Sequence, residues 1–274
     1  MPASTHLLLS GLPGKMAREV VAVAVEEQKG RYSFVSEALS GPGCPVSDNV
    51  AGQAFTLLDP DARATMAVPP YTLAVDFTQP DAALANVAFY AEKGIPFVMG
   101  TTGFDMEKAR ALVRDSGICA VIAPNMAIPI ILMQEAVAHL AANFPGAMAG
   151  HGISITESHQ SGKKDTSGTA KALAADFAKL GLPAAVDKIT MLRDPERQRA
   201  EMNVPEEHLG GHAYHSYEIT SAGGDVRLGL SHCVNGRRVY ARGTLQAVDF
   251  LARRIAAREK GKVFTMQDVL KDMG

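Results

Sequence analysis

Reactive side chains are concentrated in one short stretch of this sequence. The stretch carries the imidazole of His159, the ammonium group of Lys163 and a step of small residues, Ser167-Gly168-Thr169. An acid and a cation can quench negative charge that develops in a transition state. Small residues that open a helix leave backbone N–H groups free for an anion. The combination suits a small dicarboxylate that is reduced and protonated.

The elements that flank this stretch decide where its side chains lie. Alternating hydrophobicity at residues 153–155 predicts a strand, and the alanine-rich segment 169–177 predicts a helix. The step at Ser167 therefore opens that helix, and we expect His159 and Lys163 in the loop before it. An ordinary helix N-cap surrounded by solvated charges is the alternative interpretation.

The composition argues against several classes of protein. The chain has 274 residues, 47% of them hydrophobic, which is enough to form a large hydrophobic core. Its net charge of −2 gives no excess of positive charge with which to bind nucleic acid or an anionic membrane. Its apolar runs are too short to span a bilayer, and its start lacks the basic region of a secretory signal. Three scattered cysteines without CxxC spacing favour a reducing compartment, so we expect a cytoplasmic protein.

Short apolar runs alternate with helix-like stretches through the first half of the chain. This alternation is typical of βαβ units and predicts an α/β fold with a doubly wound parallel sheet of the Rossmann type. The expected strands are His6–Ser10, Tyr32–Leu39, Ala54–Leu58, Tyr71–Phe77, Pro96–Met99 and Ala120–Ala123. The expected helices are Lys15–Gln28, Asp81–Lys93, Asp105–Asp115 and Pro129–Ala142.

The pattern changes near residue 150. Alternating strands with glycine-containing turns follow, which predicts an antiparallel or mixed sheet. These strands are Gly152–Glu157, Ala213–Thr220, Val226–His232 and Arg238–Ala241, and a helix is expected over Gly243–Arg258. We therefore expect a dinucleotide-binding domain over 1–128 and 241–274, with an inserted α+β substrate domain over 129–240.

The first expected strand is followed by a glycine turn and the start of a helix. Gly11 permits a tight turn, Gly14 lets the backbone approach a pyrophosphate, and Ala17 is small enough for close helix packing. Such turns also occur without ligands, but a position at the first strand of a βαβ array favours a dinucleotide. The candidate cofactor-binding residues of this turn are Gly11, Pro13, Gly14, Lys15 and Met16.

The end of the second expected strand indicates which nucleotide is accepted. An acidic residue at this position binds the ribose hydroxyls of NAD, but here the position is taken by Ser40. Because no carboxylate repels a 2′-phosphate and Lys15 is available nearby, we expect NADPH to be at least as acceptable as NADH.

Three further strand ends carry small or polar residues. They are Phe77-Thr78, Gly100-Thr101-Thr102 and Ala123-Pro124-Asn125. The carboxyl ends of parallel strands form the crevice in which a nicotinamide and its ribose bind. Each segment could be a plain strand-to-helix cap, but three in succession along one sheet edge favour a cofactor-binding crevice.

Taken together, these motifs resemble the 4-hydroxy-tetrahydrodipicolinate reductase family, also called dihydrodipicolinate reductase, and in particular its plant-like branch. The resemblance covers nearly the whole chain, and the segment Glu157–Ala170 is its most specific part. It implies hydride transfer from NAD(P)H to a cyclic imine dicarboxylate. In that reaction 4-hydroxy-tetrahydrodipicolinate is reduced, by way of dihydrodipicolinate, to tetrahydrodipicolinate in diaminopimelate and lysine biosynthesis. It also implies a homotetramer built through the inserted domain.

The resemblance further implies roles for individual residues. His159 matches the catalytic acid, and Lys163 matches a proton donor that also neutralises substrate charge. The Ser-Gly-Thr turn matches the segment that holds a substrate carboxylate. The candidate substrate-binding residues are Gln160, Ser167, Gly168 and Thr169. Gln160 departs from the family pattern, because many members carry a second histidine there.

Other interpretations stay open at this point. His208, His212 and His215 could form a metal site, but no cysteine or carboxylate lies at ligand spacing, so no metal is expected. Cys119 could be the nucleophile of a semialdehyde dehydrogenase, a different enzyme on the same scaffold, although its apolar strand favours packing. A non-catalytic NADP-binding sensor is the alternative from another class, which the intact acid and cation disfavour.

Overall fold

The computed structural model describes residues 5–273, apart from the side chain of Thr65. The chain forms two compact units, one made of Met1–Ile128 with Arg238–Gly274 and the other of the inserted segment Pro129–Arg237. None of the helices within residues 5–273 has the length and apolarity needed to cross a lipid bilayer.

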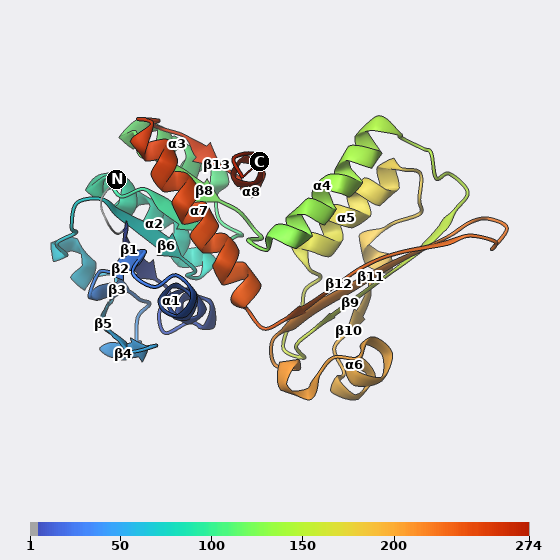
Figure 1. The fold of residues 1–274 in the computed structure, drawn as a ribbon, viewed down its shortest axis with the longest axis horizontal. Helices are drawn as coiled ribbons and strands as arrows, with labels where there is room; N and C mark the ends of the chain where they lie inside the picture. Colours follow the sequence, from blue (N-terminus) through green and yellow to red (C-terminus); the bar gives the residue numbers. More distant parts are fainter. Residues whose placement is uncertain (1–4, 274) are drawn as a thin grey trace. The chain divides into compact units, whose positions relative to one another are not determined.

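The first unit is built on a nine-stranded sheet of order β13-β8-β7-β6-β1-β3-β5-β4, with β2 also paired to β1 (Figure 1). The strands are β1 (Thr5–Ser10), β2 (Tyr32–Phe34), β3 (Glu37–Leu39), β4 (Ser47–Val50), β5 (Gln53–Leu58), β6 (Thr72–Asp76), β7 (Phe97–Met99), β8 (Ala120–Ile122) and β13 (Val263–Phe264). Neighbouring strands pair in parallel, except that β4 runs antiparallel to β5. A parallel sheet is covered on both faces, and accordingly Leu7, Leu8 and Leu9 are fully buried.

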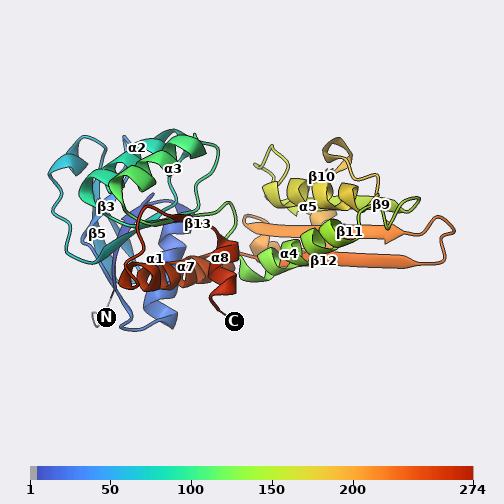
Figure 2. The same cartoon turned by 90° about the horizontal axis from the view of Figure 1, so that it is seen from above.

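Helices cover both faces of this sheet (Figure 2). The pair α1 (Lys15–Glu27) and α7 (Arg238–Ala256) lies on one face, and α2 (Pro80–Lys93) and α3 (Met106–Ser116) lie on the other. A short C-terminal helix, α8 (Met266–Lys271), packs against α7. This arrangement confirms the predicted α/β class and its doubly wound parallel sheet.

One expected strand of this unit is wrong. Arg238–Ala241 is the first turn of α7 and not a strand. Arg238 and Arg242 lie one helical turn apart, and each donates to the carboxylate of Glu27 on α1 at 2.7 Å. The hydrogen bonds from Arg242 and Arg238 lower the pKa of Glu27 to about 2. In a strand the two arginines would lie much farther apart than one helical turn, so their shared contact with Glu27 indicates the helix.

A second expectation differs in detail. The segment Tyr32–Leu39 forms two short strands, β2 and β3, because the main chain changes its pairing partner between them. Val35 N–H donates to the carbonyl of Leu7 on β1, whereas the carbonyl of Ser36 accepts from Thr56 on β5. The second strand of the sheet therefore still ends beside β1, immediately before Ser40.

The second unit contains a four-stranded sheet of order β10-β9-β11-β12. The strands are β9 (Gly152–His159), β10 (Thr190–Leu192), β11 (His212–Thr220) and β12 (Arg227–Asn235), and the helices are α4 (Ile128–Asn143), α5 (Gly168–Lys179) and α6 (Pro195–Met202). β11 runs antiparallel to β9 and β12, whereas β10 is parallel to β9. α4 and α5 bury Val137 and Phe177 against Ile155, Tyr217 and Ile219 of the sheet.

Strand alternation places the polar residues of this sheet on defined faces. Glu157 and His159 share the helix-covered face with Ile155, and the register sets His215 opposite Glu157 and His232 opposite His215. His159 is the last residue of β9, since its pairing with β11 continues to Ala213. The expectation that His159 lies in a loop is therefore wrong, and its side chain is fixed by the sheet.

Candidate active site

The glycine turn after β1 is closed by contacts within the chain itself. Gly11 has a φ of 108°, and a Cβ there would lie 2.5 Å from the carbonyl oxygen of Phe77. A Cβ at Gly14 would lie 2.5 Å from the carbonyl oxygen of Gly11, which accepts the Gly14 N–H at 2.8 Å. Both glycines are needed to form the turn before any ligand approaches it.

The helix that follows this turn fits an anionic group at its N-terminus. α1 begins at Lys15 with Gly14 as its N-cap, without a side-chain cap and without an acidic residue in its first turn. The uncapped N–H groups and the positive end of the helix dipole favour a phosphate. Lys15 is exposed beside them, Met16 is half-buried, and Pro13 precedes them in the exposed turn. The residues present therefore fit the pyrophosphate of a dinucleotide.

The sheet brings the predicted strand ends together. Ser10 is in register with Leu39 and Asp76, Asp76 with Met99, and Met99 with Ile122. The residues that follow these strands consequently lie along one edge of the sheet. They are Gly11, Ser40, Phe77, Thr78, Gly100, Thr101, Thr102, Ala123, Pro124 and Asn125.

A buried carboxylate that sequence reasoning did not assign to the site organises this edge. The side chain of Asp76 accepts hydrogen bonds from Thr78 Oγ1 at 2.7 Å and from Tyr90 at 2.8 Å. It also accepts from Asn86 at 2.9 Å and, at 3.3 Å, from Thr101. Asp76 therefore fixes the two loops after β6 and β7, because the hydroxyl groups of Thr78 and Thr101 both donate to its carboxylate.

The hydroxyl group of Ser40 is also used inside the protein. Its Oγ donates to the carbonyl of Leu12 in the glycine turn at 2.7 Å. Gly100 is packed tightly, because a Cβ there would lie 2.2 Å from the ring of Phe77. Asn125 accepts the N–H of Ala127 at 2.9 Å. These contacts fix the loops at this edge of the sheet.

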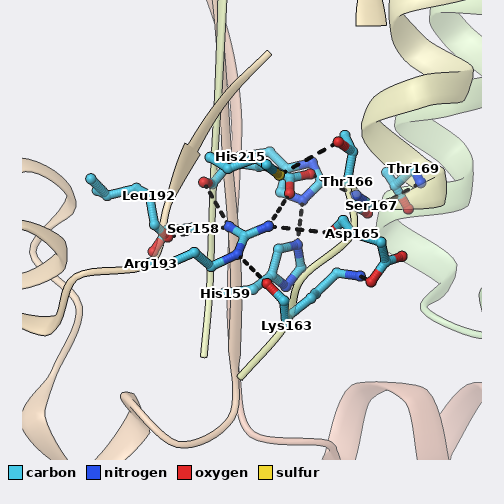
Figure 3. Close-up of polar contacts among 12 residues, drawn as sticks. Ser158, His159, Lys163, Asp165, Thr166, Ser167, Thr169, Leu192, Arg193 and His215 are labelled. Atoms are coloured by element: carbon cyan, nitrogen blue, oxygen red, sulfur yellow. Dashed lines mark hydrogen bonds and ion pairs between the residues drawn. The ribbon is translucent and has the colours of Figure 1, made fainter. Parts of the chain in front are cut away.

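In the second unit, a guanidinium group lies at the centre of the polar cluster (Figure 3). Arg193 follows β10 and donates from Nε to the carbonyl of Lys163 at 2.8 Å, and from Nη1 to the carbonyl of Glu157 at 3.3 Å. Its Nη2 forms an ion pair with the Glu157 carboxylate, which is fully buried. No local sequence signal marks Arg193, because these partners lie 30 and 36 residues away along the chain.

The side chain of Lys163 projects from the loop that Arg193 holds. Its Nζ donates to Asp165 Oδ1 at 2.8 Å (Figure 3), and the side chain of Asp165 is exposed. Hydrogen bonding to Lys163 lowers the pKa of the Asp165 carboxyl group. The main chain of Lys163 is fixed further by its N–H bond to the carbonyl of Gln160 at 3.0 Å. The main chain of Lys163 is thus held by hydrogen bonds, whereas its ammonium group is paired with an exposed carboxylate.

His159 lies beside these cations and is 8% exposed. Burial lowers its pKa to about 4, and the positive charges of Arg193 and Lys163 act in the same direction. Its carbonyl accepts a hydrogen bond from Gln198 Nε2 at 2.7 Å. Its Nε2 lies 3.1 Å from Nε2 of His215. The imidazole is therefore neutral at pH 7 in this structure, and its Nε2 faces His215.

The Ser-Gly-Thr step opens α5, as its sequence predicts. Ser167 is the N-cap, and its Oγ accepts the Thr169 N–H at 3.2 Å. The Ser167 N–H donates to Glu157 Oε2 at 2.9 Å. Two amides of the turn are thus engaged within the protein, whereas Gly168 between them is exposed. Gln160, at the start of the loop, is half-buried.

The metal and thiol alternatives do not fit this geometry. His212 is bound to Ser158 Oγ at 2.7 Å and to the carbonyl of His208 at 3.1 Å. A different group within residues 5–273, made of Glu157, His159 and His215, has potential ligand atoms within 4.8 Å of one another. The oxygens of Glu157, however, already hold Arg193 and the Ser167 amide.

Cys119 does not have the setting of a nucleophile. It is 2% exposed, and it precedes β8 at the opposite end of the strand from the polar sheet edge. Burial raises the pKa of its thiol, so the thiolate is disfavoured.

The match to known families covers both units. Residues 5–126 match the model described as "Dihydrodipicolinate reductase, N-terminus", and residues 129–270 match "Dihydrodipicolinate reductase, C-terminus". The chain belongs to the dihydrodipicolinate reductase family. Membership confirms the resemblance drawn from the motifs, and it covers the glycine turn as well as the segment with His159 and Lys163.

Individual relatives support this assignment over nearly the whole chain. The chloroplastic 4-hydroxy-tetrahydrodipicolinate reductases 1 and 2 of Arabidopsis thaliana are 36% and 37% identical, cover 97% of this chain each, and are covered over 78% and 77% of their own lengths. The 4-hydroxy-tetrahydrodipicolinate reductase of Thiobacillus denitrificans is 31% identical, with 97% of this chain and 98% of that protein covered. The plant members of the family are thus the more similar of these relatives.

Solved structures share the fold of this family member. A dipicolinate-bound dihydrodipicolinate reductase from Paenisporosarcina sp. TG-14 superposes with a TM-score of 0.60 at 18% identity, covering 97% of this chain and 99% of that chain. An aspartate semialdehyde dehydrogenase II from Vibrio cholerae superposes with a TM-score of 0.52 at 10% identity, covering 91% and 99%. The same architecture therefore accommodates different chemistry, and the reaction has to be argued from the site.

Proposed function

We propose that this chain is a 4-hydroxy-tetrahydrodipicolinate reductase, which reduces its cyclic dicarboxylate with NAD(P)H in diaminopimelate and lysine biosynthesis. The observation that carries this proposal is the placement of His159 and Lys163 on one ordered polar cluster, beside the exposed turn that opens α5. Membership of the reductase family over both units supports it independently.

The reduced nicotinamide supplies a hydride when it is bound. The turn from Gly11 to Met16 and the uncapped start of α1 would hold its pyrophosphate, and the sheet edge at Phe77, Thr78 and Gly100 would hold the nicotinamide end. Asp76 keeps the two loops of this edge in place, so the binding surface is formed in advance.

The residues of the second unit bind the substrate and handle its proton. Once a hydride has reached the ring of the conjugated imine, the electron pair left on the carbon next to the imine would take up the proton that Lys163 donates. The Lys163 ammonium group and the exposed Gly168 amide attract the substrate carboxylates. A bound dicarboxylate also raises the pKa of His159 from its low value, since it offsets the positive charges around the ring.

Finer properties belong to the same proposal. NADPH is accepted at least as well as NADH, because Ser40 and exposed Lys15 replace the carboxylate that would repel a 2′-phosphate. The protein forms a homotetramer through the second unit, whose edge strand β12 exposes Leu228 at 43%. The same proposal places the protein in the cytoplasm. Light scattering of the purified protein measures the assembly state.

The proposal is tested by turnover with freshly generated 4-hydroxy-tetrahydrodipicolinate, followed through nicotinamide absorbance and mass spectrometry of the product. We expect His159→Ala and Lys163→Ala each to lower kcat by a factor on the order of 10²–10⁴. The matched control is Lys164→Ala, which removes a neighbouring exposed ammonium group from the same loop. Absence of turnover by the unaltered protein would refute the function, and full turnover in both alanine variants would refute the assigned roles.

A further inference from the structure

A chain of hydrogen-bonded rings extends from His159 into the second unit. Nε2 of His159 lies 3.1 Å from Nε2 of His215, and Nδ1 of His215 lies 2.9 Å from the hydroxyl oxygen of Tyr217. His215 and Tyr217 are 1% and 0% exposed. All three side chains lie on the helix-covered face of the sheet, because His215 and Tyr217 are two residues apart on β11.

The hydrogen positions in this series of hydrogen-bonded rings follow from the buried hydroxyl group of Tyr217 at its far end. Within residues 5–273, the Tyr217 hydroxyl has one hydrogen-bond partner, Nδ1 of His215. A buried hydroxyl group needs an acceptor, so Tyr217 donates to that nitrogen. Burial raises the pKa of the phenol, which keeps its proton in place. His215 is then protonated on Nε2 and donates to Nε2 of His159.

The ring of His215 is held in this orientation from its other side. The ring of His232, opposite it on β12, lies with its centroid 4.4 Å away at an interplanar angle of 36°. Burial, followed by the positive charges that His232 and His159 would bring, lowers the pKa of His215 to about 2. His215 therefore remains neutral and has a single donor to offer.

We propose that His215, oriented by Tyr217, is a positioning residue that fixes the catalytic imidazole of His159 in the tautomer protonated on Nδ1. This inference rests on the proposed function for its kinetic consequence, but the tautomer itself is a property of the free protein. With the proton fixed on Nδ1, the nitrogen that takes up a proton when His159 becomes an acid is Nε2, the atom that faces His215.

The direct test is the protonation state of the ring nitrogens in protein labelled with ¹⁵N at histidine. In the unaltered protein we expect the His159 signals of an Nδ1-protonated neutral imidazole, assigned by their loss in His159→Gln. In His215→Met this preference is lost, whereas His215→Gln retains it because the side-chain amide can still donate. An Nε2-protonated His159 in the unaltered protein overturns the proposal.

Kinetics supply a second readout. His215→Met is expected to lower kcat about tenfold to a hundredfold, as is usual for groups that orient a functional imidazole, with little change in KM for NADPH. His215→Gln should restore most of kcat, and Tyr217→Phe should give a smaller loss, because His215 then adopts both tautomers. The control His139→Gln alters an exposed histidine of α4 and should leave kcat unchanged.

The outcomes separate the two proposals. If the unaltered protein lacks turnover with the dicarboxylate but His159 is protonated on Nδ1, the proposed function fails and the positioning inference stands. If the protein turns over while folded His215→Met keeps the unaltered kcat and pH profile, the positioning inference fails alone. Should His215→Met not fold, the tautomer of the unaltered protein and the Tyr217→Phe variant still decide the question.

Discussion

Arg193 is hydrogen-bonded to the main chain of Lys163, with Nε 2.8 Å from the carbonyl oxygen. The same guanidinium group forms an ion pair with the carboxylate of Glu157, which has no exposed surface. A residue far away in the sequence thus links the strand that carries His159 to the loop that carries Lys163. The position of the Lys163 main chain therefore depends on this buried pair.

Replacing Arg193 tests how stability and activity are linked through this pair. Arg193→Met leaves the Glu157 charge buried with only the Ser167 amide as its partner, so we expect a loss of about 3–5 kcal/mol in the free energy of unfolding. Urea unfolding measures this loss. kcat should fall as well, because the Lys163 loop loses its anchor.

The double variant Arg193→Met/Glu157→Gln separates the two effects. Removing the buried charge should recover part of the stability, but kcat should remain low because the loop is still unanchored. Arg197→Met is the matched control, since Arg197 forms an exposed pair with Glu201 one helical turn away. Recovery of full activity in the double variant would contradict the anchoring role.

Acid should destabilise the protein through its buried histidines. Burial lowers the pKa of His159 and of His232 from 6.5 to about 4, and that of His215 to about 2. Below pH 6.5 the unfolded chain therefore binds protons that the folded protein does not, so stability is lost as the pH falls. Each ring contributes at most about 1.4 kcal/mol per pH unit in this range.

The measurement is urea unfolding between pH 6.5 and 5, which lies above the ordinary carboxylate range. Burial lowers the pKa of His212 as well, so His215→Gln removes one of four such rings and should make the pH dependence shallower. An unchanged slope would show that this ring does not titrate on unfolding. His139→Gln, which alters an exposed histidine, should keep the slope of the unaltered protein.

Lys15 should contribute to the use of NADPH. It is exposed in the first turn of α1, which follows the glycine turn whose Leu12 carbonyl accepts the hydroxyl of Ser40. We expect Lys15→Ala to raise KM for NADPH about tenfold, as follows from losing one hydrogen bond to a charged group, and to change KM for NADH much less. Lys29→Ala removes an exposed ammonium group beyond the other end of α1 and should change neither. Equal effects of Lys15→Ala on both nucleotides would contradict a contact with the 2′-phosphate.

The first unit could be predicted well because its signals are local. Apolar runs separated by amphipathic segments define its parallel sheet, and the residues that follow each strand lie along one edge of that sheet. The pattern of Arg238–Ala241 predicts a strand, but it fits equally well a helix in which Arg238 and Arg242 donate to Glu27. Short edge strands such as β4 and β13 carry too few residues for a periodic signal.

The second unit could be predicted only in part, because its site depends on register. The motif around His159 and Lys163 is visible in the sequence, but nothing local shows that β9 extends to His159. Pairing of β11 with β9 on one side and with β12 on the other brings His215 and His232 to the same face. Arg193 and Asp76 act through partners distant in the sequence, so their roles appear only when the chain is folded.

The glycine turn offers a test that is confined to nucleotide binding. A Cβ at Gly14 would lie 2.5 Å from the backbone carbonyl oxygen of Gly11, so Gly14→Ala has to displace the turn and the start of α1. We expect it to raise the Kd for NADPH about tenfold or more, since the N–H groups that bind the pyrophosphate lose their alignment. Gly41→Ala is the matched control, because open space surrounds that position and its φ is not positive. Isothermal titration calorimetry measures both variants, and the tautomer of His159 in the other unit should be unaffected. If Gly14→Ala binds NADPH as tightly as the unaltered protein, the turn is not the site of the pyrophosphate.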